Sequence, residues 1–439
     1  MIDLAKMLEA KPSPCPYCQK IHLPGIKEVC IESGAIRKLP DFARKYGARK
    51  IFLLADKNTW QVAGKEAHQL LIDAGFAVTP YVLNMTRAEP DEHAIGSVAA
   101  HMDPSCNLFV SVGSGVINDL GKIIANLCNL PYFIVGTAPS MDGYASGSSS
   151  IIRDGLKYSL NSKCADVVIG DIDILAKAPM RMICAGVGDL FAKFISIAEW
   201  RISALITGEY FCEEIAGMVN EALQCCVDNL DGIAKRDPEA IRSVMDGMVL
   251  AGISMNYATI SRPASGIEHY ISHIFDMRGV EFGTPIDLHG IQCGIATVTS
   301  LRLYEKLRQI KRPDREQAIA AVRAFNYEDW KAFLREQLGK SAEAMIEIEA
   351  KEHKYDPELH EKRLDFIIEH WDELLAIMNT LPTSDEVAAL LKRIGAPTTF
   401  EEIGFTAEEE RNAILMSKDI RDKYVGSRLL WDLGLLETI

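Results

Sequence analysis

The sequence has no apolar run long enough to cross a membrane. Its longest apolar stretches, such as residues 133–135, are far shorter than the roughly 20 residues that a transmembrane helix needs. Residues 1–20 alternate charged and apolar side chains and lack the continuous apolar core of a secretory signal peptide. We therefore expect a cytoplasmic protein without a membrane span.

Long clusters of Lys and Arg are also missing, although 25% of the 439 residues are charged. The net charge of −14 is spread over short stretches of mixed sign, which argues against a surface that follows a nucleic-acid backbone or an anionic membrane. A local basic pocket for a small anionic substrate is compatible with this pattern. The length fits two domains, or three small ones, with room for a cleft between domains, and the 48% hydrophobic content is typical of a folded enzyme.

The cysteines form no framework of regularly spaced pairs. Eleven is an odd number, and most of them lie in apolar segments that would bury a thiol, which favours a reducing compartment. One group differs, because Cys15 and Cys18 have the C-x-x-C spacing and His22 follows them. These residues are consistent with surface cysteines, with a small structural zinc site completed by Cys30, or with a redox pair. We exclude them from the predicted active site.

Two kinds of sequence pattern predict an α/β domain followed by an all-helical domain. Up to about residue 175, short β-rich runs alternate with helical stretches, which is the pattern of a parallel sheet covered by helices. Beyond Pro179, long segments with helical periodicity dominate. We therefore predict an α/β domain over residues 1–175 and an all-helical domain over residues 176–439. The predicted strands are residues 50–55, 76–83, 108–112 and 132–135.

A turn with two glycines follows the third predicted strand. Gly113-Ser114-Gly115 leads into a helix predicted over residues 118–127, and such a turn lets backbone N–H groups approach a pyrophosphate. The spacing is not the G-x-G-x-x-G of dinucleotide-binding folds, because the next glycine is Gly121. A tight strand-to-helix turn without a ligand is therefore the alternative interpretation.

Two further strand ends carry polar or small residues. Asp56 follows the first predicted strand, where its carboxylate would either accept hydrogen bonds from a ribose or form an Asx turn. Residues 136–147 follow the fourth strand with little side-chain bulk and many hydroxyl groups. This segment is either a flexible linker or a loop that lines a ligand cleft. Its place at the carboxyl end of a strand favours the loop.

Three of the ten histidines, His269, His273 and His289, fall within 21 residues. His269 and His273 are four apart and would share a helix face, and His289 begins the next predicted helix. Two imidazoles and a carboxylate would hold a divalent metal and leave a position open for a substrate oxygen. The candidate carboxylate is Asp189, which we place at the start of the first long helix, where an N-cap is the alternative role.

The order of these motifs resembles the superfamily of iron-containing alcohol dehydrogenases and dehydroquinate synthases. The glycine turn, then Asp189, then the motif at residues 268–273 and His289 follow one another as in that superfamily. Residues 137–146, residues 261–266 and the tail over residues 420–434 are similar to its glycerol-1-phosphate dehydrogenase branch. The similarity covers nearly the whole chain from about Leu23.

The resemblance implies a metal-dependent, NAD(P)-linked dehydrogenase that interconverts dihydroxyacetone phosphate and sn-glycerol 1-phosphate. It implies a metal held by Asp189, His269 and His289, and a substrate in contact with Asp142, Asp189 and His273. It assigns the nicotinamide cofactor to the first domain, and metal and substrate to the second. The implied cofactor contacts are Asp56, Gly113, Ser114, Gly115, Val116, Ile117, Thr137, Ala138, Pro139, Ser140 and Ser146.

The predicted chemistry is hydride transfer to a ketone, with Asp189 and His273 as the catalytic residues. A divalent cation would stabilise the negative charge that develops on the ketone oxygen, and His273 would donate the proton. Asp56 at the ribose position favours NAD(H), with NADP(H) as the alternative. The family points to zinc or nickel, and iron is a further candidate.

The substrate phosphate needs a cation, for which Arg262, Lys163 and Lys193 are candidates. We also expect a homo-oligomer, a dimer or larger. Two alternative functions belong to the same superfamily, namely a dehydroquinate-synthase-like lyase that regenerates its cofactor and a polyol dehydrogenase acting on glycerol. A metallohydrolase is disfavoured because Tyr270 stands where an H-E-x-x-H motif has its glutamate. The glycine turn argues against a metal-binding protein without catalysis.

Overall fold

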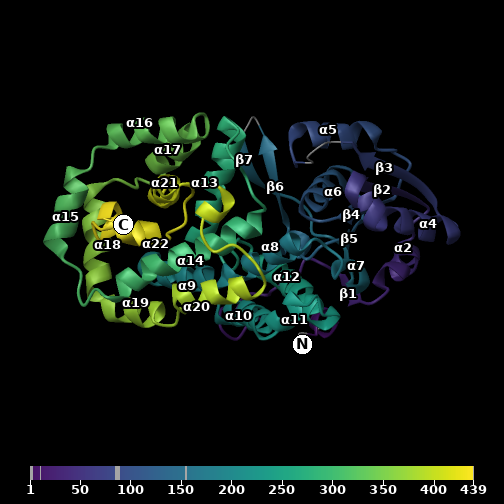
Figure 1. Ribbon diagram of the computed structural model, residues 1–439, viewed down its shortest axis with the longest axis horizontal. Helices are drawn as coiled ribbons and strands as arrows, with labels where there is room; N and C mark the ends of the chain where they lie inside the picture. The colour runs from purple at the N-terminus through teal and green to yellow at the C-terminus, as the bar shows by residue number, and fades with distance from the viewer. Residues whose placement is uncertain (1–2, 10, 85–88, 154–155, 439) are drawn as a thin grey trace. The chain divides into compact units, whose positions relative to one another are not determined.

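The computed structural model describes residues 3–9, 11–84, 89–153 and 156–438. Its contacts divide the chain into two units (Figure 1). Unit 1 comprises Met1–Leu190 and Glu214–Ser261, and unit 2 comprises Phe191–Glu213 and Arg262–Ile439. Residues 214–261, which the sequence places in the helical half, therefore pack with the sheet-containing unit.

Unit 1 is built on a six-stranded sheet in the order β1-β8-β5-β4-β2-β3, and all neighbouring strands are parallel. The strands are β1 Glu28–Glu32, β2 Lys50–Asp56, β3 Ala77–Leu83, β4 Leu108–Gly113, β5 Tyr132–Gly136 and β8 Val167–Asp171. The structure confirms the four predicted strands as β2 to β5. It adds β1 and β8, and a separate antiparallel hairpin of β6 Ser148–Arg153 and β7 Leu156–Asn161.

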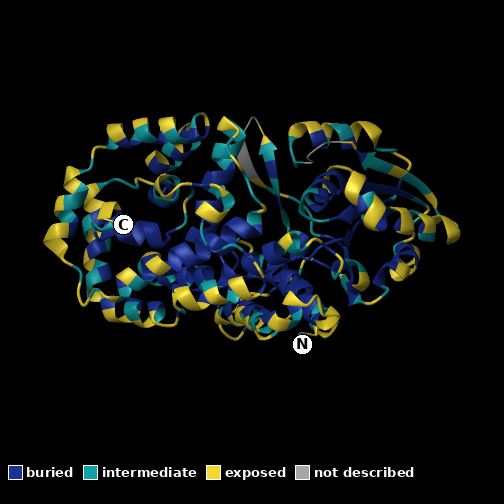
Figure 2. Cartoon of the chain, viewed as in Figure 1, coloured by how far each residue is buried: buried dark blue, intermediate teal, exposed yellow. Residues whose placement is uncertain are grey.

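Helices cover both faces of this sheet, so its central strands are buried on both sides (Figures 1 and 2). On one face, Ile51, Leu53 and Val110 pack with Leu39 and Leu71 from two covering helices. The helical segments of unit 1 are α1 Leu4–Glu9, η1 Ala35–Lys38, α2 Leu39–Lys45, α3 Lys57–Thr59, η2 Trp60–Gly64, α4 Lys65–Asp73, α5 Glu92–His101, α6 Gly115–Leu127, η3 Asp142–Ala145, α7 Ile172–Leu175, α8 Met180–Phe191, α10 Glu213–Asp228, α11 Leu230–Ala234 and α12 Pro238–Ala258.

The strand order reverses direction between β2 and β4. From β2 the chain adds β3 on one side, and then β4, β5 and β8 follow on the other side. In open parallel sheets, ligands bind outside the carboxyl ends of the strands at such a switch point. Asp56 ends β2 and Gly113 ends β4, so two of the predicted cofactor-binding positions lie at the carboxyl ends of these two strands.

Strand β3 forms one edge of the sheet and is only partly buried. Pro80 lies within it, opposite Leu53 of β2 in the register. A proline offers no N–H group to a strand ladder, and it is tolerated in a sheet mainly at an edge.

Unit 2 is all-helical. Large side chains such as Trp200, Tyr270 and Tyr304 are fully buried in it. Its helical segments are α9 Lys193–Thr207, α13 Ile267–Phe282, α14 His289–Arg308, α15 Arg315–Ala324, α16 Tyr327–Leu338, α17 Ser341–Lys351, α18 Pro357–Glu369, α19 Trp371–Met378, α20 Ser384–Arg393, η4 Glu401–Ile403, α21 Ala407–Ser417, α22 Gly426–Asp432 and η5 Leu436–Thr438. The α/β and all-helical fold class predicted from the sequence is therefore confirmed.

Helix α8 corrects one prediction about Asp189. The sequence places this residue at the start of a helix, but α8 begins at Met180 and Asp189 lies in its last turn. Gly186 and Gly188 resemble a break in the sequence, yet both lie inside the helix. The role of N-cap is thereby excluded for Asp189.

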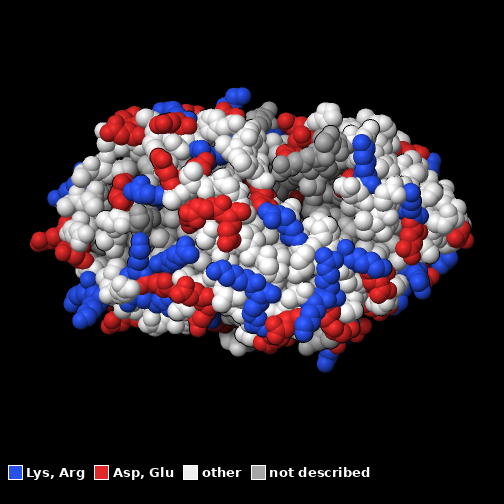
Figure 3. Space-filling model, viewed as in Figure 1, with Lys and Arg blue, Asp and Glu red and all other residues white. Residues whose placement is uncertain are grey.

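The surface agrees with the scattered charge of the sequence. On the face shown in Figure 3, Lys and Arg side chains are interspersed with Asp and Glu. Among the residues that the structure describes, no helix combines the length and the apolar character needed to cross a bilayer.

Asp246 of α12 is a buried carboxylate whose ionisation should reduce the stability of unit 1. Its side chain is 4% exposed, and Arg242 Nε lies 3.5 Å from Oδ2. Burial raises the pKa of Asp246 to about 7, although Arg242 opposes the rise. Because the folded pKa exceeds the unfolded value, the folded state binds the proton more tightly, and stability falls as the pH rises from about 4 to about 7.

We expect Asp246→Asn to be more stable than the wild type at pH 8, by about 2 kcal/mol, with the difference vanishing near pH 4. Thermal unfolding of both proteins between these pH values measures the effect. Asp228→Asn, at an exposed position of α10, is the control and should change little. A destabilised Asp246→Asn protein at pH 8 would show that the Arg242 ion pair outweighs the cost of burial.

Candidate active site

The three predicted histidines come together in unit 2. His269 and His273 lie on α13, and His289 is the first residue of α14. The His289 ring centroid is 5.0 Å from that of His269 and 5.5 Å from that of His273. The spacing in the sequence therefore identified a true cluster of imidazoles.

Neighbouring side chains engage the Nδ1 atoms of two of these rings. Glu268 Oε1 lies 2.9 Å from His269 Nδ1, and Ser272 Oγ lies 3.1 Å from His289 Nδ1. A carboxylate at Nδ1 favours the tautomer in which Nδ1 carries the proton, and this leaves the Nε2 lone pair to a metal. Glu268 is fully buried, and its Oε1 also accepts the N–H of Gly266 at 2.7 Å.

A hydrogen-bond chain continues from Ser272 to the vicinity of His273. Gln292 Nε2 donates to Ser272 Oγ at 3.2 Å and to Asp276 Oδ1 at 2.8 Å. Asp276 Oδ2 in turn lies 3.9 Å from His273 Nδ1. His273 therefore sits beside a carboxylate, an arrangement that suits a residue that holds and releases a proton.

Cys293 is a member of this cluster that the sequence analysis missed. Its Sγ lies 3.5 Å from His289 Nε2, and potential ligand atoms of His269, His289 and Cys293 lie within 4.8 Å of one another. Burial by itself would raise the pKa of this thiol, but the two imidazoles lower it to about 7. Its position one helical turn after His289 was the available signal.

Asp189 lies in unit 1, where it contacts Asp142. Its side chain is 1% exposed, and its Oδ2 accepts the backbone N–H of Asp142 at 2.9 Å. The two aspartates predicted to contact the substrate are thus neighbours. Asp189 belongs to a different unit from His269 and His289, so the three predicted metal ligands come from both units.

Residues 137–147 form an ordered loop rather than a flexible linker. Thr137, Ala138 and Ser140 are buried, and the Tyr144 hydroxyl donates to the Ala138 carbonyl at 2.6 Å. The buried Lys122 Nζ donates to the Gly143 carbonyl at 3.2 Å. The loop predicted to contact the cofactor is therefore fixed in place by the body of unit 1.

Helix packing also fixes this loop at its other side. A Cβ on Gly186 would lie 1.9 Å from the carbonyl oxygen of Pro139, so α8 approaches the loop more closely than any side chain would allow. Ser146 lies at the other end of the loop, where its hydroxyl is 3.4 Å from Lys122 Nζ.

The glycine turn leads directly into α6, which begins at Gly115 and runs for 13 residues. Val116 and Ile117 are thus in its first turn, where backbone N–H groups point away from the helix. A Cβ on Gly113 would lie 2.5 Å from the Cβ of Ile117, so this position requires glycine. The arrangement suits the binding of a phosphate group at the helix N-terminus.

Asp56 forms the Asx turn that the sequence analysis gave as one of two possible roles for its carboxylate. Its Oδ1 accepts the N–H groups of Asn58 at 2.7 Å and Thr59 at 2.8 Å and caps α3. These bonds hold the carboxylate at the end of β2, beside the switch point of the sheet.

The candidate phosphate-binding cations are all engaged by other groups. Arg262 is buried, and its Nε donates to Glu209 Oε2 at 2.9 Å. Lys163 lies in unit 1 and donates to the Leu130 carbonyl at 2.7 Å. Lys193 Nζ donates to the Ala264 carbonyl at 3.0 Å, directly before α13.

Lys423 is a further cation near the segment before α13, and the sequence analysis did not identify it. Its Nζ donates to Ser265 Oγ at 2.7 Å. Burial, with Arg262 and Arg421 nearby, lowers the pKa of Lys423 to about 7. Several cations of unit 2 thus gather around the segment that leads into the helix of His269.

Known proteins of one family are similar to this chain. The sequence model described as iron-containing alcohol dehydrogenase matches residues 30–179. The chain is 27% identical over 426 residues to a glycerol-1-phosphate dehydrogenase (NAD(P)+) of Halalkalibacterium halodurans, covering 96% of each chain. It is 31% identical over 280 residues to a protein of the same name from Methanosarcina mazei, covering 63% of this chain and 76% of the relative.

Solved structures show the same fold at low sequence identity. Glycerol dehydrogenase from Schizosaccharomyces pombe aligns with a TM-score of 0.62 and 14% identity, over 94% of this chain and 89% of that chain. NADH-dependent butanol dehydrogenase A from Thermotoga maritima aligns with a TM-score of 0.59 and 14% identity, over 93% of this chain and 96% of that chain. The chain therefore belongs to the iron-containing alcohol dehydrogenase family, in its glycerol-1-phosphate dehydrogenase branch.

Proposed function

We propose that this chain catalyses the metal-dependent, NAD(P)-linked interconversion of dihydroxyacetone phosphate and sn-glycerol 1-phosphate. The observation that carries the proposal is the match to glycerol-1-phosphate dehydrogenases along 96% of the chain. The imidazole cluster of unit 2 and the glycine turn at the switch point of unit 1 support it, because the reaction needs both an electrophilic centre and a dinucleotide site.

The residues present fit a divalent metal. Two imidazoles, His269 and His289, have their Nδ1 atoms engaged by Glu268 and Ser272, and the thiol of Cys293 lies beside them. We propose that His269 and His289 hold the metal together with Asp189. Imidazole and carboxylate ligands suit zinc, nickel or iron, and the nearby thiol favours zinc or nickel.

When bound, the cation would draw electron density from a ketone oxygen, and the reduced nicotinamide would supply the hydride. The chain's own contribution is positioning. We propose that the turn at Gly113 to Gly115 and the N-terminus of α6 bind the pyrophosphate, while residues 137–140 and Ser146 border the nicotinamide half. Asp56 at the end of β2 would accept hydrogen bonds from the ribose, which favours NAD(H) over NADP(H).

His273 is the proposed proton donor to the new hydroxyl group. We expect His273→Ala to lower kcat about 100-fold while its metal content stays at the wild-type level, because the residue moves a proton and does not hold the metal. Metal analysis and steady-state rates on the same preparation measure both quantities. Loss of the metal from His273→Ala would make His273 a ligand and would contradict this assignment.

Lys423 is the proposed partner of the substrate phosphate, and Lys193, which donates to the Ala264 carbonyl, is a second candidate. An anion would stabilise the charged form of a buried lysine that already lies near Arg262 and Arg421. We expect Lys423→Met to raise the KM for dihydroxyacetone phosphate about tenfold or more, with a smaller effect on kcat. The KM for unphosphorylated dihydroxyacetone should be the same in Lys423→Met and in the wild type.

The matched control is Lys362→Met, at an exposed position of α18 in the same unit. It should leave both KM values unchanged. An equal rise in KM for the phosphorylated and unphosphorylated ketones would show that Lys423 acts on the fold of the site and not on the phosphate.

The direct test of the proposed function is an assay of the purified chain after chelation and after re-addition of zinc, nickel or iron. We expect NADH oxidation with dihydroxyacetone phosphate only after metal is restored, slower oxidation of NADPH, and sn-glycerol 1-phosphate by chiral analysis. Faster turnover of glycerol itself would indicate a polyol dehydrogenase, and cofactor regeneration without net oxidation would indicate a lyase. Sedimentation of the same preparation tests the expected homo-oligomer.

A further inference from the structure

The N-terminal segment of unit 1 folds into a tight turn around two cysteines. The Tyr17 N–H donates to Cys15 Sγ at 3.4 Å, and the Gln19 N–H donates to the Cys15 carbonyl at 2.9 Å. Gln19 adopts a left-handed backbone with φ 61°, which closes the turn. A backbone N–H group aimed at a cysteine sulfur stabilises negative charge on that sulfur, as a thiolate metal ligand requires.

His22 presents one ring nitrogen to the same place. Its Nε2 lies 3.4 Å from Cys18 Sγ, and its Nδ1 lies 3.1 Å from the Tyr257 carbonyl of α12. A carbonyl oxygen only accepts, so Nδ1 carries the proton and the Nε2 lone pair faces the cysteines. This is the tautomer in which a histidine binds a metal while its second nitrogen is held by a backbone carbonyl.

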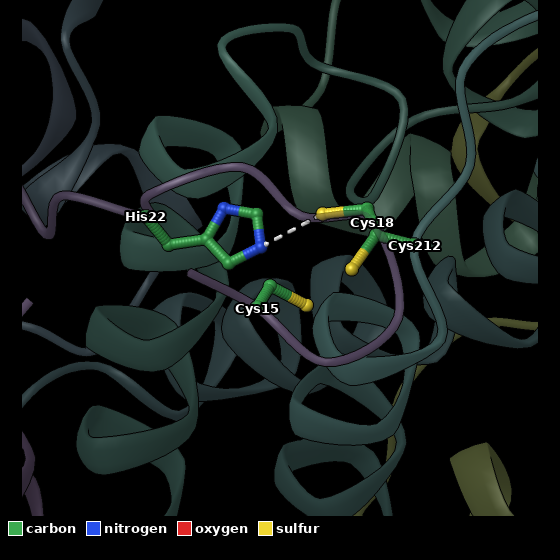
Figure 4. Close-up of side chains that lie close together, drawn as sticks. All are labelled: Cys15, Cys18, His22 and Cys212. Atoms are coloured by element: carbon green, nitrogen blue, oxygen red, sulfur yellow. Dashed lines mark hydrogen bonds between the residues drawn. The ribbon is translucent and has the colours of Figure 1, made fainter. Parts of the chain in front are cut away.

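The fourth member of the cluster is Cys212, not the Cys30 considered from the sequence. Cys212 belongs to the segment Phe191–Glu213 of unit 2 and directly precedes α10, which belongs to unit 1 from Glu214 onward. Figure 4 shows the sulfur atoms of Cys15, Cys18 and Cys212 and the His22 ring pointing toward one another, and their ligand atoms all lie within 4.8 Å of one another. Cys30 instead lies in β1 and packs in the core of the sheet.

We propose that Cys15, Cys18, His22 and Cys212 bind a structural zinc ion that is separate from the active-site metal. A tetrahedral zinc with bonds of about 2.3 Å to sulfur needs ligand separations of about 3.8 Å, so the observed set needs to contract by only about 1 Å. Three thiolates and one imidazole are a soft donor set with all four positions filled, which is typical of a structural site and leaves none for substrate. Cys15, His22 and Cys212 are buried, which protects such a site from exchange.

The segment that follows the proposed zinc site is linked by hydrogen bonds through Asn256 to the loop that the proposed function assigns to the cofactor. Asn256 of α12 donates from Nδ2 to the carbonyls of Pro24 and Ala145, both at 2.6 Å. Its Oδ1 accepts the Gly147 N–H at 3.0 Å. The segment that follows His22 is thus joined to residues 145–147 through one amide.

Cobalt substitution of the full chain tests the site without reference to activity. Cobalt bound by thiolates absorbs strongly in the near ultraviolet through sulfur-to-metal charge transfer, and its visible bands report tetrahedral geometry. We expect both signatures in the wild type and in His289→Ala, because the second protein loses only the proposed active-site metal. We expect Cys18→Ser and Cys212→Ser to lose the charge-transfer band in whole or in part, and Cys30→Ser to keep it.

The zinc content of the wild-type protein gives a second measurement. Zinc analysis of the wild type after dialysis against a weak chelator should retain a single ion per chain, and a thiol-blocking mercurial should release it. The proposal is overturned if His289→Ala retains no metal, if Cys30→Ser and not Cys212→Ser loses the cobalt band, or if the mercurial releases no zinc. A disulfide between Cys15 and Cys18 in freshly purified protein would equally exclude it.

Discussion

Replacement of His289 by alanine is expected to lower turnover on the order of a thousandfold and to remove the active-site metal, because several kilocalories of charge stabilisation depend on that cation. His289 stands 5.0 Å from His269 between ring centroids, and Ser272 already engages its Nδ1. Loss of its Nε2 leaves too few ligands to hold a metal in place. Elemental analysis and the rate of NADH oxidation are the two measurements.

The control for this substitution is His93→Ala, an exposed histidine on α5 that should leave metal and rate unchanged. Metal analysis of His289→Ala also distinguishes the two proposed metal sites, because this variant should lose the active-site metal and keep the zinc of the cysteine site. Wild-type turnover by His289→Ala would refute the assignment of the metal site, and with it the catalytic scheme.

Replacement of Gly186 by alanine is expected to destabilise unit 1 by about 3 kcal/mol and to raise the KM for NADH. The added methyl group would meet the Pro139 carbonyl oxygen at 1.9 Å and its carbon at 2.9 Å, and neither backbone atom can rotate away. Either α8 or the loop of residues 137–140 must move. Thermal unfolding and cofactor titration measure the two effects.

Gly217→Ala is the matched control, because Gly217 is also helical, belongs to the same unit, and has nothing within 4 Å of its virtual Cβ. That substitution should be neutral or stabilising by about 0.5–1 kcal/mol, since alanine loses less backbone freedom on folding. If both alanine variants are equally stable, the close approach of α8 to the loop is not a constraint on the fold.

The sequence predicted those features that depend on residues close together along the chain. Strands β2 to β5 are apolar runs bounded by turns, and His269, His273 and His289 are neighbours along the chain as well as in space. Cys293 was within reach of the same reasoning, because it lies one helical turn after His289. The predicted ligand set contained only imidazoles and a carboxylate, so this thiol was not included.

The features that escaped prediction depend on contacts between distant segments. Strand β1 is only partly buried, and its partner β8 comes more than a hundred residues later. Cys212 has no spacing relative to Cys15 that a sequence pattern could reveal. The sequence predicts Asp189 at a helix start, whereas α8 already begins at Met180 and uses Gly186 to approach the Pro139 carbonyl.

Pro80 has a consequence for how copies of this chain assemble. A long exposed edge of a sheet is a template onto which another chain's edge can add, whether in a continuous intermolecular sheet or in an aggregate. Because β3 lacks a donor at Pro80, this edge is poorly suited to such pairing. Subunits are therefore not expected to extend one sheet into the next through the β3 edge.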